Sequence, residues 1–361
     1  MAKEKRPVRK VAFPRYADYN APIRYVLENG LDVKCILPPR LTHRTMEIGS
    51  KYSPDFVCTP FKTLLGNMIE ALEAGADTLV MVYGICKLGY YGELQEQILR
   101  DLGYEFNFIN LAKYDTGKMK DLFKAATDFN PHLRFRKVLR VLKEAVKMAE
   151  HIDAVTSEYY QNLGFEIQKG SFKKAYEAFI ADMYAANTKE EIEQARAKVK
   201  LAFTQLPISK PSQPLRVGIV REFYTAMNQF SNFEVELKLA QMGVEIHRWM
   251  NITNRFLHYP GEKNLNVRIR DYCAYEMGAT STANIWSAKD YAERGFDGMI
   301  HIKSANCTPE IDIMPVLQNI SADYKIPILY LTYDAQTSDV GLMTRLEAFY
   351  DMISMRKKVV R

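Results

Sequence analysis

Short apolar segments alternate with segments of helical periodicity along the first third of the chain, and this alternation constrains the fold most strongly. Strands are predicted at residues 8–13, 33–37, 78–82 and 105–111, with helices at 21–29, behind Pro60, and at 92–102. Strands separated by helices are typical of a parallel sheet with crossover helices. Ligands of such sheets bind beyond the carboxyl ends of the strands.

The same alternation returns in the last part of the chain. Strands are predicted at 216–220, 244–248, 299–302 and 327–331, with helices at 233–242, 288–294 and 343–355. The intervening residues are helical up to a proline-rich stretch, which indicates a linker. We therefore predict an α/β fold with two Rossmann-like parallel-sheet lobes and a helical connector. Its parts are a first lobe (8–114), the connector (115–206), the linker (207–214) and a second lobe (215–361).

The composition favours a cytoplasmic protein with two hydrophobic cores. The chain has 361 residues, of which 47% are hydrophobic. No segment approaches the roughly 18 apolar residues that a membrane span needs, and no apolar segment follows the charged N-terminus. The five cysteines lack the paired spacing of a disulfide scaffold. The net charge of +6 comes without a nucleic-acid-binding motif, so we expect neither nucleic acid nor a membrane as a partner.

Cys307 lies where the hydrophobic period changes. Residues 299–302 form an apolar run of strand length, and the apolar residues from Ile311 to Ile320 recur at helical spacing. Pro309 and Glu310 suit the first turn of a helix. The cysteine is therefore predicted at a strand-to-helix junction, where the helix dipole stabilises a thiolate.

The Cys-Thr-Pro sequence at Cys307 also occurs at Cys58, again ahead of a helix and a strand. Aligning the two copies gives an offset of 249 residues (307 minus 58) and places strand on strand. This predicts two related lobes. In this alignment the counterpart of Cys86 is Ala335.

Three segments around these cysteines resemble a known family. They are residues 56–62 (Phe-Val-Cys-Thr-Pro-Phe-Lys), residues 83–91 (Tyr-Gly-Ile-Cys-Lys-Leu-Gly-Tyr-Tyr), and Cys-Thr-Pro-Glu at 307–310 continuing through 344–349. They are similar to the iron–sulfur component of the 2-hydroxyacyl-CoA dehydratases, which is related to benzoyl-CoA reductase subunits. The small activase-related CoA dehydratase branch is the most similar. The resemblance covers roughly residues 8–130 and 213–355.

The resemblance implies a [4Fe–4S] cluster in the cleft between the lobes, bound by Cys58, Cys86 and Cys307. One iron would then have no cysteine ligand. An ATP-hydrolysing iron–sulfur activator would deliver a low-potential electron. This activator would be a separate protein, because the chain lacks a phosphate-binding Gly-x-x-x-x-Gly-Lys loop. The reaction would be the radical dehydration or reduction of a CoA thioester, by a homo- or heterodimer. Glu310 and Lys62 are the candidate catalytic residues.

Several alternatives remain open from the sequence. Three thiolates also suit zinc, and three buried thiols can lack a metal altogether. An electron carrier that dehydrates no substrate, and a reductase with a bridged double cluster, are the competing functions. Glu310 can serve simply as a favourable charge at a helix start. Cys35 and Cys273 are predicted to be ordinary buried residues, Cys273 within a helical stretch at 267–277.

Overall fold

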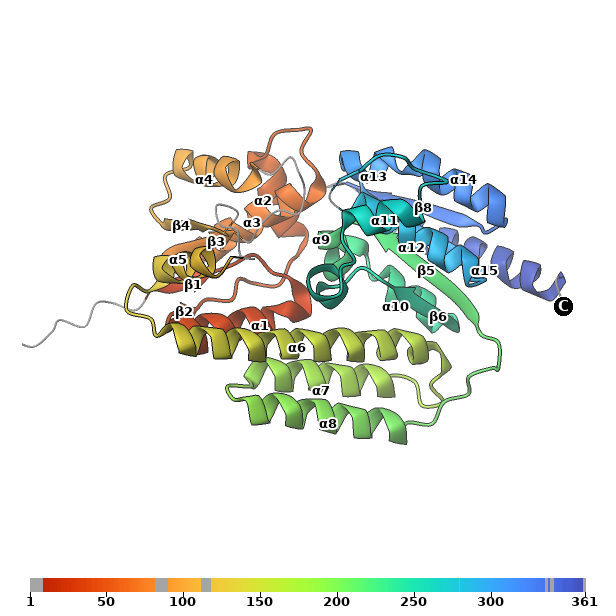
Figure 1. Cartoon of the computed structure of the whole chain (residues 1–361), viewed down its shortest axis with the longest axis horizontal. Coiled ribbons are helices and arrows are strands. Elements are labelled where there is room, and N and C mark those ends of the chain that lie inside the picture. Colours follow the sequence, from red (N-terminus) through yellow and green to blue (C-terminus); the bar gives the residue numbers. More distant parts are fainter. Residues whose placement is uncertain are drawn as a thin grey trace, which may run out of the picture. The chain divides into compact units, whose positions relative to one another are not determined.

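The computed structural model describes residues 9–81, 90–111, 118–278, 280–334, 337 and 341–359. It contains two four-stranded parallel sheets, with strand orders β2-β1-β3-β4 and β6-β5-β7-β8 (Figure 1). The predicted α/β fold with two parallel-sheet lobes is therefore confirmed. In the described part of the chain, no helix is long and apolar enough to cross a membrane.

The contacts between residues divide the chain into two compact units. The first unit comprises Met1–Asp55, Phe61–Met148 and Met183–Ile192, and the second comprises Phe56–Pro60, Ala149–Asp182 and Glu193–Arg361. The short segment around Cys58 thus belongs to the same unit as Cys307. Each unit contains one of the sheets.

The strands of the first sheet have fewer residues than the apolar segments that predict them. Its strands are β1 (Lys10–Ala12), β2 (Lys34–Cys35), β3 (Thr78–Met81) and β4 (Asn107–Asn110). The accompanying helices are α1 (Asn20–Tyr25), a π-helical turn (Val26–Gly30), α2 (His43–Tyr52), α3 (Thr59–Glu73), α4 (Tyr91–Asp101) and α5 (Met119–Phe129). Val11, Val80 and Ile109 from three strands pack against Phe129 and Val138 from helices to form one core.

Helix α2 was not predicted, and its packing depends on two glycines. Thr42 caps it together with Thr45, which takes the place that Glu or Gln usually has in such a cap. A Cβ atom added to Gly66 would lie 2.0 Å from the carbonyl oxygen of Thr45, and one on Gly49 would lie 1.8 Å from that of Lys62. Helices α2 and α3 therefore cross at backbone contact, which only glycine permits at these two positions.

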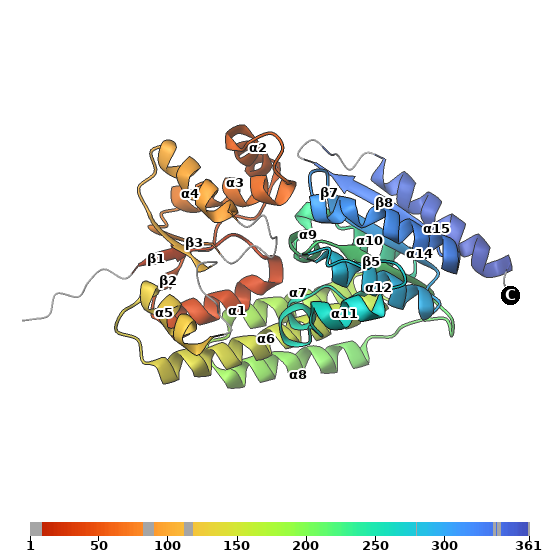
Figure 2. The ribbon, with the colours of Figure 1, turned by 45° about the horizontal axis from the view of Figure 1, so that its top comes forward.

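Three long helices follow, as the periodicity predicts: α6 (Phe135–Asn162), α7 (Ser171–Ala185) and α8 (Lys189–Gln205). They lie side by side in Figures 1 and 2. In the second unit, the rings of Tyr159 and Tyr176 stack with centroids 4.5 Å apart, and those of Phe172 and Phe203 lie 4.9 Å apart. These aromatic contacts join α6 to α7 and α7 to α8.

The second sheet consists of β5 (Leu215–Arg221), β6 (Val244–Arg248), β7 (Gly298–Ser304) and β8 (Ile328–Tyr333). All seven residues of β7 are buried, as expected for an inner strand covered on both faces. The helices of this part are α9 (Phe223–Met227), α10 (Val235–Gln241), α11 (Glu262–Arg268), α12 (Ser281–Glu293), α13 (Thr308–Asp312), α14 (Met314–Tyr324) and α15 (Leu342–Val359).

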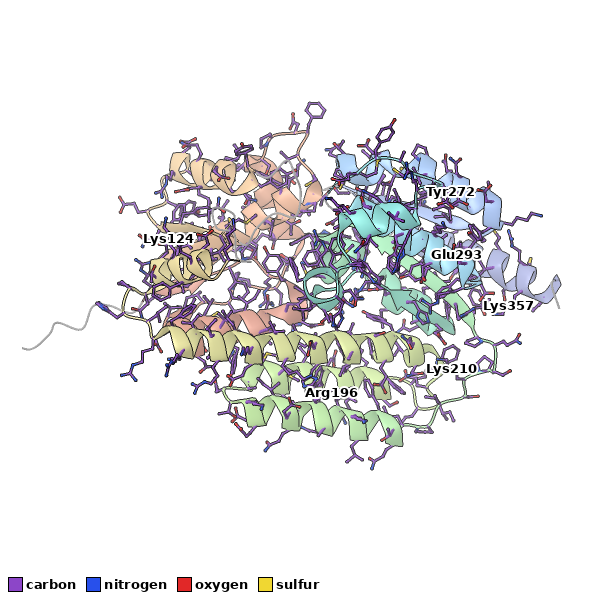
Figure 3. All side chains as sticks on the ribbon, in the orientation of Figure 1. Lys124, Arg196, Lys210, Tyr272, Glu293 and Lys357 are labelled. Atoms are coloured by element: carbon purple, nitrogen blue, oxygen red, sulfur yellow. The ribbon has the colours of Figure 1, made fainter. Side chains whose placement is uncertain are left out.

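Helix α15 lies at the place of the helix predicted at 343–355 and packs on the second sheet. A Cβ atom on Gly298 would lie 2.7 Å from the ring of Phe349, so the missing side chain admits that ring. Near the end of the helix, the ammonium of Lys357 lies 2.8 Å from the carboxylate of Asp297 (Figure 3). The predicted helix at 343–355 is extended by a few residues.

The predicted helix from Pro309 to Ile320 is interrupted. It forms two helices that meet at Ile313, because Pro315 lacks the N–H that would continue the first and is favoured at the start of the second. Ile313, Leu317 and Ile320 are fully buried, whereas Ile311 is 41% exposed. The helix predicted around Cys273 is also wrong, because α11 ends at Arg268 and Cys273 follows a turn at residues 269–272.

The two sheets share one strand order, and this order contradicts the predicted offset of 249 residues. Both sheets have the spatial order second, first, third, fourth strand, so β3 corresponds to β7 and β4 to β8. The alignment of the Cys-Thr-Pro sequences would instead pair β3 with β8. The register predicted from the shared tripeptide therefore disagrees with the strand order.

The register that agrees with the strand order is marked by one aspartate in each sheet, directly before β3 in the first and before β7 in the second. The carboxylate of Asp77 accepts a hydrogen bond from the N–H of Lys10 (3.0 Å), and that of Asp297 accepts one from the N–H of Arg216 (2.8 Å). The aspartates lie 220 residues apart (297 minus 77). In each case a glycine with positive φ lies two residues before the aspartate, at the end of the preceding helix.

This register changes which positions of the first sheet correspond to the cysteines of the second. Cys86 follows β3 in the sequence and falls one position from Cys307, which follows β7. Cys58 precedes the helix that leads into β3, so its counterpart lies close to Gly278. Ala335, which the earlier alignment set against Cys86, has no such relation to it.

An ion pair connects the linker to the second sheet and provides a test of stability. The carboxylate of Glu245 on β6 lies 2.7 Å from Lys210 in the linker (labelled in Figure 3) and 2.5 Å from His247. Burial raises the pKa of Glu245, but the hydrogen bonds from His247 and Lys210 outweigh it and bring the pKa from 4.5 to about 2. The ionised carboxylate therefore stabilises the folded state.

We expect Glu245→Gln to lower the free energy of unfolding by about 1–2 kcal/mol at pH 7, a value reduced for partial solvent exposure. The contribution of Glu245 is complete above pH 4.5 and is lost as the pH falls toward 2, so the two proteins should converge in acid. Urea unfolding at a series of pH values measures this difference. Glu47→Gln, at an exposed position on α2, is the control and should behave as wild type. A difference independent of pH would contradict the assignment.

Candidate functional site

The segment at Cys58 is hydrogen-bonded to the end of β7. The N–H of Thr59 donates to the hydroxyl of Ser304 (2.8 Å), which in turn donates to the hydroxyl of Thr59 (3.0 Å). The side-chain amide of Asn306 donates to the carbonyl of Val57 (3.4 Å). These contacts lie within the second unit. They bring together two cysteine segments that lie far apart in the sequence, and we call Cys58, Cys307 and the residues around them the cysteine site.

Cys307 is placed by the turn between β7 and α13. Its carbonyl accepts hydrogen bonds from the N–H groups of Glu310 (3.1 Å) and Ile311 (3.0 Å), and Pro309 lies in the first turn of α13. Cys307 thus occupies the predicted strand-to-helix junction. The predicted stabilisation of a free thiolate is wrong, because burial, followed by the charges of Glu310 and Glu222, raises the pKa of Cys307. Direct coordination by a metal ion would deprotonate such a thiol.

The carboxylate of Glu310 connects this turn to neighbouring elements through hydrogen bonds. The side chain is fully buried. One carboxylate oxygen accepts hydrogen bonds from the hydroxyl of Thr280 (3.0 Å) and the amide of Asn284 (2.7 Å), and the other lies 2.9 Å from Nε2 of His301. Three protein groups therefore surround the carboxylate. In this position Glu310 joins the start of α13 to α12 and to β7.

Lys303 is a largely buried lysine near Cys307. It lies on β7, two residues after His301 and therefore on the same face of the sheet. Burial lowers the pKa of Lys303, while the nearby groups of Cys307 and Glu310 act in the opposite direction. Lys303 and His301 were not predicted as site residues. The available signal was a charged residue at the end of an otherwise apolar strand.

The ends of two neighbouring strands border the same region. Glu222, directly after β5, accepts hydrogen bonds from the N–H groups of Tyr224 and Thr225, both at 2.6 Å. Burial raises the pKa of Glu222, and the charge of Glu310 adds to this effect. At the end of β8, the hydroxyl of Thr59 donates to the carbonyl of Tyr333 (3.4 Å). The site thus lies at the carboxyl ends of parallel strands, where ligands of such sheets bind.

The remaining predicted site residues are only partly described. Cys86 and Ala335 lie outside the described residues. Lys62 lies on α3 in the first unit, and its ammonium donates to the carbonyl of Asp55 (3.3 Å). Within the described ranges, no group of three His, Cys, Asp or Glu side chains could hold a metal ion. Of the three predicted cysteine ligands, the structure therefore brings two segments together and leaves the third untested.

The donor chemistry of the cysteine site fits a thiolate-bound iron–sulfur centre. Thiolates are the ligands that iron–sulfur clusters prefer, and the charges of Cys58 and Cys307 are close enough to affect each other. The charge of Lys303 interacts with that of Cys307, so this lysine can compensate part of the negative charge on such a centre. The carboxylates nearby are bound within the protein, so they are less suited than the thiols to hold a metal.

Comparison with known proteins assigns no family to the chain. Neither the protein-family models nor the curated protein sequences give a match. The resemblance to the dehydratase iron–sulfur component therefore stays a prediction.

Proposed function

We propose that this protein binds a [4Fe–4S] cluster through Cys58, Cys86 and Cys307 and accepts a low-potential electron from a separate ATP-hydrolysing activator. The observation that carries the proposal is the joining of the Cys58 segment to the end of β7, next to Cys307, by side-chain hydrogen bonds. The resemblance around all three cysteines supports the identity of the cluster and of the activator.

Bound at this site, the cluster supplies one-electron redox chemistry at low potential. The residues of the chain serve to place and surround it. Ser304 and Asn306 hold the segment that carries Cys58, and Glu310 fixes the turn that carries Cys307. Both cysteines are thereby presented by hydrogen-bonded backbone, as a preorganised metal site requires.

The proposed reaction is the dehydration or reduction of an acyl-CoA-type substrate, as in the family that the chain resembles. In this role the protein is a 2-hydroxyacyl-CoA dehydratase-like lyase or a related reductase component. Three cysteine ligands would leave one iron of such a cluster open to an exogenous ligand.

An electron carrier without dehydratase activity is the second candidate. It is favoured by the state of Glu310, whose two carboxylate oxygens are both bound to protein groups. A carboxylate held in this way is poorly placed to exchange a proton with a substrate. Both candidates share the cluster and the activator.

Anaerobic reconstitution with iron and sulfide tests the common part of the proposal. We expect four iron and four sulfide per chain, and a paramagnetic resonance signal after reduction by the activator only when ATP is hydrolysed. Binding of zinc alone, or no binding of iron, would refute the proposal. Loss of water from added 2-hydroxyacyl-CoA thioesters would identify the dehydratase, and reduction without turnover of any thioester would identify the carrier.

A further inference from the structure

Arg15 carries a guanidinium group that the protein holds in place at the carboxyl edge of the first sheet. The residue lies shortly after β1, and its Nε donates to the carbonyl of Pro38 (2.6 Å), which lies beyond the end of β2. Its backbone N–H donates to the fully buried side chain of Asn67 (2.8 Å), whose amide also donates to the carbonyl of Pro39 (3.4 Å). The segments that follow two neighbouring parallel strands are thereby joined at the edge where ligands of such sheets bind.

The terminal nitrogens of Arg15, Nη1 and Nη2, have no hydrogen-bond acceptor among the described residues. Arg40, in the segment after β2, is exposed and forms neither a hydrogen bond nor an ion pair within the described ranges. Burial lowers the pKa of Arg15, the charge of Arg40 lowers it further, and the charge of Glu70 acts in the opposite direction. The carboxylate oxygens of Glu70 accept hydrogen bonds from the hydroxyl of Thr45 at 3.1 and 2.9 Å. Two guanidinium groups are therefore neighbours here, and no described carboxylate lies at ion-pair distance from either.

The second sheet has a corresponding pair of arginines that a carboxylate neutralises. Arg15 and Arg221 hold equivalent positions, because each lies five residues (15 minus 10 and 221 minus 216) after the residue whose N–H binds the aspartate before the third strand. Arg221 is fully buried, and Glu236 binds both Arg221 (2.7 Å) and Arg248 at the end of β6 (3.1 Å). The described part of the first unit provides no such carboxylate for Arg15 and Arg40. The place of the acceptor is therefore open to an anion from outside the chain.

We infer that Arg15 and Arg40 bind the phosphate group of a small molecule, with Arg15 contacting two phosphate oxygens through Nη1 and Nη2. The planar guanidinium fork matches the geometry of a phosphate, and the hydrogen bond from Nε to Pro38 fixes the plane of this fork. Two positive charges suit a phosphate monoester, which carries a charge of about −1.5 to −2 at pH 7, better than a carboxylate with a single charge. This inference goes beyond the proposed function and does not depend on a cluster at the cysteine site.

The first test is isothermal titration calorimetry of the full chain with inorganic phosphate and with adenosine 5′-monophosphate, at constant ionic strength. We expect saturable binding at one site in the wild type. Arg15→Gln should weaken this binding by at least about tenfold, because it removes charged hydrogen bonds. Arg15→Lys keeps the charge but not the fork, so it should weaken binding nearly as much. Arg100→Gln is the matched control, since it removes the same charge from α4, where Arg100 is paired with Glu96 at 2.7 Å, and it should bind as wild type.

The second test uses Arg40→Gln, which removes no hydrogen bond of the described chain and should therefore leave the fold intact. We expect several-fold weaker phosphate binding in this variant. Phosphate should raise the melting temperature of the wild type and raise that of Arg40→Gln and Arg15→Gln less. The melting temperatures without phosphate show whether each variant is folded.

The outcomes separate the sources of the phosphate and the two proposals. Tighter binding of adenosine 5′-monophosphate than of inorganic phosphate would identify an ester as the ligand, and equal or weaker binding would identify the free ion. Absence of saturable binding in the wild type, or wild-type affinity in folded Arg15→Gln and Arg40→Gln, would overturn the inference. A protein that binds phosphate but no iron would refute the proposed function and leave this inference in place.

Discussion

Replacing Cys307 with alanine should abolish iron and sulfide incorporation, whereas Cys273→Ala and Cys35→Ala should retain the wild-type content. Cys307 lies at the end of β7 beside the Cys58 segment, and a three-thiolate centre that loses one ligand also loses the geometry that the other two depend on. Cys58→Ala and Cys86→Ala should have the same effect. Iron and sulfide analysis after anaerobic reconstitution measures the outcome.

The two other cysteines are suitable controls because their surroundings differ. The thiol of Cys273 is buried and contacts the carbonyl of Tyr275 at 3.3 Å. Burial, together with the charge of Glu28, raises the pKa of Cys35 to about 12. Circular dichroism and the melting temperature should show that each variant is folded. Full iron content in a folded Cys307→Ala protein would refute the ligand assignment.

Replacing Glu310 with alanine should lower the free energy of unfolding by about 3–5 kcal/mol. The substitution leaves the hydrogen-bonding groups of Thr280, Asn284 and His301 buried and unsatisfied. It also releases the start of α13, so iron incorporation should fall as well. Urea unfolding of the metal-free protein separates the loss of stability from the loss of metal.

Glu310→Gln distinguishes a positioning role from a catalytic one. Its amide oxygen can accept from Thr280 and Asn284, and its amide nitrogen can donate to Nε2 of His301 if the histidine carries its proton on Nδ1. We expect a loss of only about 1–2 kcal/mol and nearly full iron content. Asp312→Ala, at an exposed position on α13, should be neutral. Normal iron content with no turnover in Glu310→Gln would identify Glu310 as an acid–base group.

Much of the fold could be predicted because each element carries its own local pattern. The apolar strands and the long helices between Phe135 and Gln205 are visible in the sequence without knowledge of their partners. Relations between elements were harder to predict. The register of the two sheets was misassigned because three matching residues outweighed the Gly-x-Asp pattern that precedes β3 and β7. That pattern was visible in the sequence and marks the same backbone contact in both sheets.

The cysteine site was predictable only in part. Cys58 and Cys307 could be selected from their shared sequence context, and the structure brings their segments together. The surroundings could not be predicted, since Thr280 and Asn284 come from a helix whose distance from Glu310 depends on tertiary packing. The burial of Lys303 could not be predicted from sequence alone, because it results from four strands and the helices that cover them.

The separation of the Cys58 segment from its hydrogen-bonding partners has a consequence for the order of folding. The strands of the first sheet are complete once residue 110 has been synthesised, and domains generally fold as they emerge from the ribosome. Thr59, by contrast, binds Ser304 across 245 residues and Tyr333 across 274. The Cys58 segment can therefore form these hydrogen bonds only after residue 333 has been translated. Insertion of the proposed cluster would therefore be a late event in biogenesis, and an oxidant present during translation would react with the Cys58 thiol before Ser304 and Tyr333 have been synthesised.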